Sequence, residues 1–565
     1  MSGEESSGHD AQESLEKVEI ALQETSNIDS SVKHLINQER LKPRYQTRRP
    51  KSKGAILVLV WNFLVWSAYA YLTHTAVNAF SYAGIIFHIL QAVTAGLVMP
   101  LTGWLADVRF GRYKVVTWSS WAMWISSLLV TASFVVVQLV ESYKATHKIL
   151  SLALLVPLGI GFCGFQANII QFGVDQLPDA STDEITSFIV WYAGTFISGR
   201  FAQDFTLSCV PKHNIFGPLL LSLHLTVVIA THHLFNHLLI KEPVTQNPFK
   251  LVYDVIKYAV NNKHPRQRSA FTFCEDDLPP RIDFGKYKYG GPFTTEQVED
   301  VKTLFRLTLF AFVVSVFYGT SQDEDHFISQ LRKVLIYRVT GHASDSLWNC
   351  FSNYICFSGF YFITAIVLIP VNEAFVYPIF QRCLPHLKIY SKFILGALLR
   401  IGKYITLLTL YYYTRQHHHP ETSNATPNNC LFQETPSSLS GNLNKGWFIL
   451  PQVFHAVSDL LIVISMIEFF CAQVPYSMKG IVAGITYGLI GMFIAFDQII
   501  SLPFIMKSLH WGTRIISCGF WYLLMKLLFL ILVAILSLFA RRCKLRKRQD
   551  VLPNEQIFAE RYYST

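Results

Sequence analysis

The chain has 565 residues, of which 51% are hydrophobic and 15% charged, and its formal net charge is +10. Soluble globular proteins carry about 25% charged residues, so this deficit and a mean hydropathy of +0.31 indicate an integral membrane protein. The basic surplus does not indicate a nucleic-acid partner, because Lys and Arg gather at the ends of apolar segments and no nucleic-acid-reading motif is present.

Residues 1–53 are polar, with Ser, Glu and Gln in excess and no apolar segment. Such a composition is typical of a disordered tail and differs from that of a signal peptide. We therefore expect a disordered cytosolic N-terminal tail. The first apolar segment then serves as an uncleaved insertion signal.

Twelve apolar segments follow, each near the length of about twenty residues that a helix needs to cross the bilayer core. The first six are 55–77, 83–105, 114–140, 149–170, 185–206 and 215–240. The second six are 302–320, 345–370, 391–413, 446–470, 478–506 and 513–540. The pattern predicts an all-α membrane protein, with one six-helix bundle over 54–240 and a second over 302–540.

The basic residues predict how these segments are oriented. Lys and Arg are enriched just before the first segment, after the last one over 541–565, and in the connections 106–114 and 377–392. This bias places both termini in the cytosol, with the plasma membrane as the expected location. The connection 321–344 runs against the pattern, because it is predicted to be outside yet contains three basic residues beside an acidic "DED".

A polar connection over 241–301 separates the two sets of six segments, and we expect it to be a cytosolic loop with amphipathic helices. It contains "NPFKLVYDVIKYAV", which predicts a surface helix, and Gly290-Gly291-Pro292, which forces a turn. Thr294 or Thr295 then caps a helix that runs into the membrane.

The outer connection 414–445 carries an N-x-T glycosylation acceptor at Asn424. Its histidines 417–419 form either a metal site or part of a solvated loop. Cys209 and Cys430 both fall in outer connections, where they either pair or remain separate thiols.

No cofactor is expected from the remaining residues. The ten cysteines form no C-x-x-C and no zinc spacing. His233 and His237 lack an acidic or cysteine partner, and we interpret them as interface histidines. No catalytic cluster near an interface is visible, so the chain is not expected to be an enzyme.

The short stretch "GWLADVRFGRYKVV", residues 103–116, joins the second and third segments. Its candidate functional residues are Gly103, Asp107, Arg109, Gly111 and Arg112. The glycines permit close backbone approach, Asp107 can cap a helix end or pair with an arginine across the loop, and Arg112 and Lys114 are expected to face the cytosol. The stretch is either a charged turn that holds the topology or part of an inner gate.

The Gly-x-x-x-Asp and Gly-Arg pattern of this loop resembles the signature loop of the major facilitator superfamily. The same position in the second half holds "NEAFVYPIFQR", a degenerate echo consistent with two related halves. The resemblance implies the major facilitator fold, with about twelve transmembrane helices in two six-helix halves around a midplane cavity.

Three further stretches resemble the proton-dependent oligopeptide transporter family of that superfamily. They are "GIGFCGFQANIIQFGVDQLPD", "YGGPFTTEQVEDVK" and "LPQVFHAVSDLLIVISMIEFFCAQVPYSMKG". This resemblance implies proton-coupled transport of a di- or tripeptide or a peptide-like solute by alternating access. The implied partners are that small molecule, protons and the lipid bilayer.

The first span departs from the family's Glu-x-x-Glu-Arg motif. Trp61, Leu64 and Val65 occupy the positions of the two glutamates and the arginine, and only Tyr69 matches a family tyrosine. The family's lysine position on the fourth span holds Gln166. Because these titratable groups are missing, an uncoupled facilitator, a carrier of another organic or anionic solute, and a transport-dead receptor remain alternatives.

On the tenth span, the family's glutamate position falls near Asp459. Asp459 and Glu468 are nine residues apart, so they are expected on opposite helix faces. Asp459 is either a coupling or substrate residue or a buried aspartate held by a neighbouring helix, and Glu468 either faces the cavity or pairs with a cation at the inner end.

On the fourth span, Gln166 and Asn168 hydrogen-bond either a neighbouring helix or a substrate. Asp175 and Gln176 end the same span. We expect Asp175 to hold an inner gate loop, by capping or through an ion pair.

Overall fold

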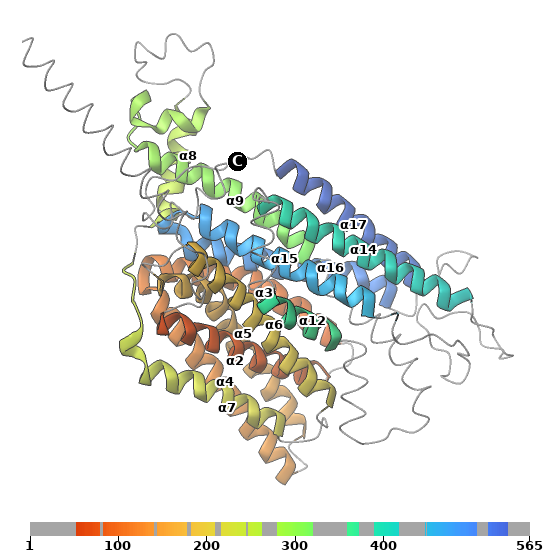
Figure 1. Cartoon of the computed structure of the whole chain (residues 1–565). Coiled ribbons are helices and arrows are strands. Elements are labelled where there is room, and N and C mark those ends of the chain that lie inside the picture. The colour runs from red at the N-terminus through yellow and green to blue at the C-terminus, as the bar shows by residue number, and fades with distance from the viewer. Residues whose placement is uncertain are drawn as a thin grey trace, which may run out of the picture. The chain divides into compact units, whose positions relative to one another are not determined.

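The computed structural model describes residues 52–78, 83–140, 144–177, 182–209, 216–244, 247–262, 280–319, 359–371, 389–416, 447, 449–505 and 518–540. Within these residues all regular elements are helical, and one isolated bridge joins Lys286 to Phe293 (Figure 1).

The N-terminal half contains six long helices. They are α2 (Lys53–Asn78), α3 (Ala83–Leu105), α4 (Arg112–Leu139), α5 (Lys144–Asp175), α6 (Thr182–Cys209) and α7 (Phe216–Leu234). Each lies on one of the first six predicted segments. The largest difference is at α7, which ends at Leu234 rather than at residue 240 and is followed by the short 3-10 turn η3 (Asn236–Leu238).

In the C-terminal half, the described residues form six further long helices that lie on the other predicted segments. They are α9 (Thr295–Gly319), α12 (Phe360–Val371), α14 (Ile389–Gln416), α15 (Ile449–Gln473), α16 (Lys479–Ile505) and α17 (Cys518–Ala540). The described residues cover only part of the predicted segment 345–370. The tail segments 1–51 and 541–565, the connections 321–344 and 372–388, and the loop 417–446 lie outside them.

Five of the described helices are long and apolar enough to cross a membrane, judged by length and composition alone. These stretches are Arg112–Val136, Thr295–Tyr318, Lys392–Leu410, Ile449–Cys471 and Lys479–Asp497. Large apolar side chains also remain on the outside of the bundle, and Leu97 is 70% exposed. An apolar surface of this kind is suited to contact with lipid rather than with water.

The helices pack within each half and also between the halves. In the N-terminal half α2 packs on α6 and α7, and in the C-terminal half α14 packs on α15 and α17. The two halves meet most extensively where α3 runs along α16. Figure 1 shows the helices lying roughly side by side along a common direction.

The central connection folds against the start of α9. Its helix α8 (Pro248–Asn261) begins at Asn247, whose side chain accepts a hydrogen bond from the Phe249 N–H at 3.1 Å. Val255 of α8 is buried against Val298 and Val301 of α9. The surface helix that the sequence predicts is therefore present, and it packs on the extension of α9 beyond the second predicted bundle.

Two short turns, η5 (Arg281–Gly285) and η6 (Tyr287–Tyr289), lead into α9. Gly290 adopts a φ of 80°, which explains the glycine at the predicted turn. Thr294 is the residue that caps α9: its hydroxyl accepts from the Gln297 N–H at 3.2 Å, and the Gln297 side chain accepts from the Thr294 N–H at 3.0 Å.

Four charged side chains fasten this connection to α9. Lys286 Nζ lies 2.6 Å from Asp283 Oδ1 and 2.5 Å from Glu299 Oε1. Lys302 Nζ contacts the same two carboxylates. Burial lowers the pKa of Lys286, but hydrogen bonds to Asp283 and Glu299 outweigh it, so the pKa is raised above its ordinary value.

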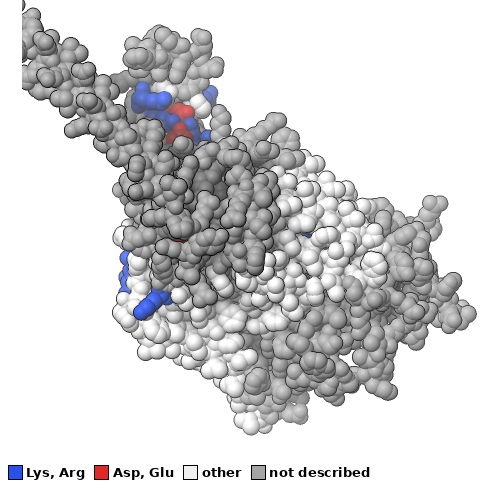
Figure 2. Space-filling model, in the orientation of Figure 1, with Lys and Arg blue, Asp and Glu red and all other residues white. Residues whose placement is uncertain are grey.

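Charged side chains are unevenly distributed over the visible surface. Figure 2 shows Lys and Arg beside Asp and Glu at the top of the view, further Lys and Arg at the left edge, and a largely uncharged expanse over the rest of the described surface. Among the described residues of the central connection, the exposed basic ones are Lys241, Lys250, Lys257, Arg281 and Lys288. This distribution separates a water-facing end from a lipid-facing body.

Candidate functional site

The loop between α3 and α4 contains the π-helical turn η1 (Ala106–Phe110), followed by Gly111. Gly111 has a φ of 81°, and a side chain there would meet only the Glu242 carbonyl oxygen, at 3.7 Å. Gly111 is therefore required by its backbone conformation, and the predicted close approach is wrong at this position. Arg109 is exposed.

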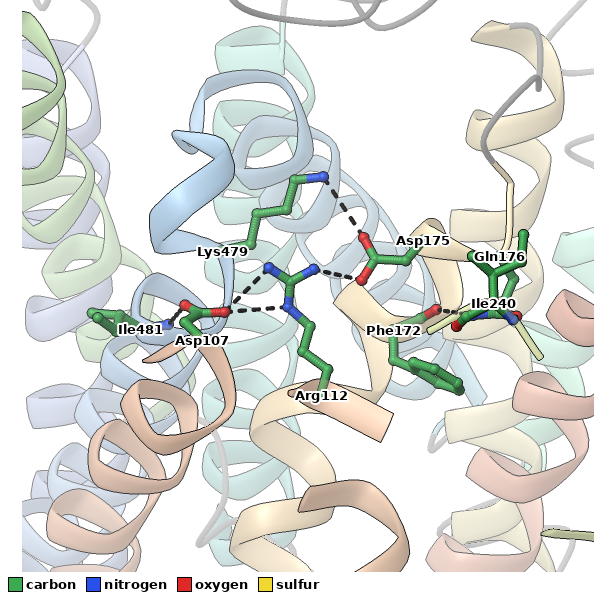
Figure 3. Close-up of polar contacts among 8 residues, drawn as sticks. All are labelled: Asp107, Arg112, Phe172, Asp175, Gln176, Ile240, Lys479 and Ile481. Carbon is green, nitrogen blue, oxygen red and sulfur yellow. Dashed lines mark hydrogen bonds and ion pairs between the residues drawn. The ribbon is translucent and has the colours of Figure 1, made fainter. Parts of the chain in front are cut away.

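Asp107, Arg112 and Asp175 form a buried ion-pair chain after this turn (Figure 3). Arg112 Nη2 lies 3.1 Å from Asp107 Oδ1, and Arg112 Nη1 lies 2.5 Å from Asp175 Oδ2. Arg112 is only 6% exposed, so the prediction that it faces the cytosol is wrong. The two carboxylates offset the cost of burying its guanidinium. Lys114 is exposed, as predicted.

The same chain reaches the C-terminal half through α16. Asp107 Oδ2 accepts a hydrogen bond from the Ile481 N–H at 3.0 Å, where the first turn of α16 has backbone donors without partners in the helix. Lys479 Nζ lies 3.8 Å from Asp175 Oδ1. We call the end of the bundle that carries Asp107, Arg112, Asp175 and Lys479 the loop face (Figure 3).

Glycines bring α3 and α16 into backbone contact beside the loop face. A Cβ atom on Gly103 would lie 2.1 Å from the Gly480 carbonyl oxygen. A Cβ on Gly484 would lie 2.4 Å from the Met99 carbonyl oxygen. The close approach that the sequence predicts for Gly103 is therefore present, and it joins the two halves.

Gln176 hydrogen-bonds the end of α5 to the backbone of Ile240, in the segment that follows α7 and η3. Its Nε2 donates to the Phe172 and Ile240 carbonyl oxygens at 3.2 and 3.0 Å, and its Oε1 accepts from the Ile240 N–H at 2.8 Å (Figure 3). Its amide therefore binds protein backbone from two segments. Asp175 and Gln176 thus make different contacts, one across the halves and one within the first half.

A second polar cluster lies inside the C-terminal half, and we call it the α14–α15 cluster. Arg400 of α14 pairs with Asp459 of α15. The Tyr361 hydroxyl of α12 donates to Asp459 Oδ2 at 2.7 Å, and His455 Nε2 lies 3.1 Å from the same oxygen. Lys403 Nζ lies 2.9 Å from His455 Nδ1.

Of the five members of the α14–α15 cluster, only Asp459 was expected from the sequence to be a site residue. The signal for two others was present, because Arg400 and Lys403 lie three residues apart inside a predicted membrane span. Cations in such a position are costly unless they have partners. His455 is also one helical turn before Asp459. Tyr361 carries no comparable signal, because tyrosines are common in this chain.

Glu468 binds a different cation on the same neighbouring helix. Lys392 Nζ of α14 lies 2.9 Å from Glu468 Oε2. Glu468 and Asp459 thus both pair with cations of α14, and for Glu468 the structure shows the alternative of pairing with a cation. Long Lys and Arg side chains reach around the helix, and the nine-residue spacing does not decide the partner.

Of the two predicted polar residues on α5, Asn168 bonds within its own helix. Its Nδ2 donates to the Gly164 carbonyl oxygen at 2.9 Å, a partner that the sequence did not suggest. Gln166 is 3% exposed and lies beside Tyr192 of α6, which also faces Tyr487 of α16. Gln166 Oε1 has no hydrogen-bond partner within the described residues. The side chain of Tyr69 lies outside the described residues.

On the first span, buried aromatic and aliphatic side chains occupy the positions at which the family carries charged residues. Trp61 is fully buried, stacks on His232 at a centroid distance of 3.5 Å, and donates from Nε1 to Thr231 Oγ1 at 2.8 Å. Val65 is also fully buried. The charged side chains described at mid-bundle therefore come mostly from the C-terminal half.

No group of three or more His, Cys, Asp or Glu side chains suited to a metal ion occurs among the described residues. Asn424, Cys430 and histidines 417–419 lie outside them. The glycosylation of Asn424 therefore stays a prediction. So do the two alternatives for Cys209 and Cys430, and the two for the histidine loop.

Comparisons with known proteins agree with this architecture. A family model described as the POT family matches residues 113–509. An auto-inhibited POT family peptide transporter has a TM-score of 0.57 at 15% identity, over 89% of this chain and 100% of that one. The POT family transporter PepTSo has a TM-score of 0.57 at 14% identity, over 87% and 99% of the two chains.

A further solved structure, of a proton dependent oligopeptide (POT) family transporter, has a TM-score of 0.52 at 16% identity, over 86% of this chain and 99% of that one. At such identities a structural likeness shows the fold. That fold is the major facilitator architecture of two six-helix halves, as the sequence predicted.

Proposed function

The chain belongs to the POT family, and on that premise we propose that it carries a small peptide or peptide-like solute across a membrane, coupled to protons. The proposed mechanism is alternating access, in which the two six-helix halves rock about a midplane cavity. The single observation that carries it is the chain of contacts from Asp107 and Arg112 to α16, which closes one end of the bundle between the halves.

The loop face has the properties of a reversible gate. Its contacts are few and polar, and they join the N-terminal half to the first turn of α16. Opening would break the Asp107–Ile481 and Asp175–Lys479 contacts, whereas Arg112 could keep both carboxylates within its own half. We propose that Gly103, Asp107, Arg112 and Asp175 form this inner gate, with Arg109 and Gly111 shaping its turn.

The proposed substrate region lies between Gln166 on α5 and the α14–α15 cluster. Gln166 offers an amide oxygen without a protein partner in the described residues, and Tyr487 brings α16 to the same place. Asp459 already binds Arg400, Tyr361 and His455. We propose that Asp459 organises the site and that Gln166 contacts substrate, with Tyr69 and Asn168 as further candidates.

The orientation remains part of the proposal. Both termini and the loop face would lie in the cytosol, and the outer loop with Asn424 would lie outside the plasma membrane. In this arrangement the domains are the tail 1–53, the bundle 54–240, the central loop 241–301, the bundle 302–540 and the tail 541–565.

An uncoupled facilitator, or a carrier of another organic or anionic solute, is the second candidate. It is favoured by the buried Trp61 and Val65 at positions where family members carry charges. The aromatic seal leaves no titratable side chain at these positions. The two candidates differ in whether uptake follows a proton gradient.

The deciding experiment is uptake of a di- and tripeptide panel into proteoliposomes with and without an inward proton gradient. We expect gradient-driven peptide uptake by the parent and its loss in Asp459→Asn. Asp254→Asn on the surface helix α8 is the matched control and should transport normally. Peptide uptake that ignores the gradient would favour the facilitator, and the absence of peptide uptake with correctly folded protein would overturn the peptide proposal.

A further inference from the structure

The side chain of His455 is more accessible than those of its partners Asp459 and Arg400 in the α14–α15 cluster. Its side chain is 22% exposed, whereas the Asp459 and Arg400 side chains are 11% and 0% exposed. α15 ends at the loop face, so His455 lies on the far side of Asp459 from the closed gate. A proton that enters from the side opposite to the loop face therefore meets His455 before Asp459.

The contacts of His455 determine which of its nitrogens carries a proton. Lys403 Nζ, 2.9 Å from Nδ1, has only hydrogens to offer, so Nδ1 accepts. Asp459 Oδ2, 3.1 Å from Nε2, is an acceptor, so Nε2 carries the hydrogen. The arrangement is therefore that of a neutral imidazole between a lysine and a carboxylate.

A second proton on His455 is incompatible with this arrangement. It would have to bind at Nδ1, and an imidazolium N–H would then face the Lys403 ammonium at hydrogen-bond distance with no acceptor between them. Protonation must therefore separate Lys403 from His455. The contact to Asp459 would instead be strengthened, because an imidazolium is a charged donor to a carboxylate.

We propose that His455 is a proton-accepting switch in the C-terminal half, and that Lys403 is the group it releases. The Nδ1 lone pair takes one proton from solvent, Lys403 loses its contact with Nδ1, and Asp459 holds the imidazolium from the other side. This inference rests on the proposed function for its use in transport, and it supplies a titratable site in place of the charged residues that Trp61, Leu64 and Val65 replace on the first span.

The switch acts among other charges. Arg400 on α14 and Tyr361 on α12 face His455 itself. Tyr318 on α9 interacts with Asp459, Arg200 on α6 with Tyr361, and Lys526 on α17 with Lys403, and Lys526 also pairs with Asp497 on α16. When the Lys403 ammonium moves away from His455, it changes the electrostatic potential at the other charged groups of α14 and α17. Because α14 packs on both α15 and α17, displacement of one lysine can bias how these helices sit together.

The test needs no substrate. Full-length protein in proteoliposomes on a solid-supported membrane is taken from about pH 8 to about pH 5, the range in which histidine changes charge, and the displaced charge is recorded. We expect a titrating signal in the parent and loss of most of it in His455→Asn. The matched control is His233→Asn, an exposed histidine at the end of α7, which should keep the signal.

A second variant keeps the histidine and removes its opposing cation. In Lys403→Gln the imidazolium no longer meets an ammonium, so the midpoint of the signal should move to higher pH by about one unit or more. A full signal in folded His455→Asn, or an unmoved midpoint in Lys403→Gln, would overturn the switch. If the parent shows the His455-dependent signal but takes up no peptide, the proposed substrate is refuted and the proposed switch is supported.

Discussion

Asp107, in the turn after α3, accepts a hydrogen bond from the backbone N–H of Ile481, although 374 positions separate the two residues along the chain. The bond joins the N-terminal half of the protein to the first turn of α16. A carboxylate at this place satisfies a backbone donor that the helix itself cannot satisfy. The positive end of the α16 helix dipole also stabilises this negative charge.

Asp107→Ala should loosen the loop face. The substitution leaves the Ile481 N–H and one side of the Arg112 guanidinium without their acceptor, at a cost of about 1–3 kcal/mol. Hydrogen exchange in a peptide covering 479–485 should therefore become about tenfold faster or more. A peptide from the middle of α5 serves as the internal control, and unchanged exchange at 479–485 would show that this contact does not hold the gate.

Gly103→Ala should separate α3 from α16. The added methyl would lie 2.1 Å from the Gly480 carbonyl oxygen, so backbone must shift, at about 1–3 kcal/mol. Gly159→Ala is the matched control on α5, because its methyl would meet nothing within 4 Å. Thermal unfolding in detergent should show a lower midpoint for the first variant and an equal or higher midpoint for the second. Equal effects of the two substitutions would contradict the close backbone contact between α3 and α16.

Arg400→Met should destabilise the C-terminal half more than the paired change. Removing Arg400 alone leaves Asp459 as a buried charge without its guanidinium, a loss of about 3–5 kcal/mol. Arg400→Met combined with Asp459→Leu removes both charges and should recover most of the thermal midpoint. Transport should remain lost in the double variant, and a double variant no more stable than the single one would refute the pairing.

The cluster around Lys286 should hold the central connection over the whole neutral pH range. The raised pKa of Lys286 means that its stabilisation is fully present below the ordinary lysine pKa of about 10.4 and is lost as pH rises through the higher folded value. Limited proteolysis of 247–294 should thus accelerate only at strongly alkaline pH. Lys286→Gln should show fast cleavage already at neutral pH, whereas Lys257→Gln on the exposed face of α8 should not.

Asn424 offers a test of the proposed orientation. Asn424→Gln should remove a mass that a glycan-cleaving enzyme also removes from the parent expressed in eukaryotic cells. An antibody tag at either terminus should be reached only after the plasma membrane is permeabilised. A tag reached on intact cells would place that terminus outside and contradict the proposed cytosolic orientation, and only one such terminus would contradict the even number of spans.

Local signals in the sequence were enough to place the described helices, although several ends differ by a few residues. The apolar segments match the helices because the thickness of the bilayer sets their length. Asn247 and Thr294 cap the helices that follow them, since a cap depends on only a few neighbouring residues. The family resemblance was readable in the same way, from short motifs in order along the chain.

The candidate site was only partly predictable. The position of Asp107 in its motif was evident, but the burial of Arg112 depends on Asp175, which lies 63 residues away. Arg400, Lys403 and His455 were visible as polar residues in apolar segments, yet no spacing rule connects α14 to α15. The choice of Lys392 as the partner of Glu468 likewise depends on how these two helices pack.

The sequence by itself determined the helical class, the two sets of six spans, the helices of the central connection and the family. These follow from hydrophobic length and from contacts between neighbours in the chain. Only the tertiary structure decided which charges meet, because buried ions find partners through helix packing and not through sequence distance. It thereby brought Asp107 to α16 and placed His455 between a lysine and an aspartate.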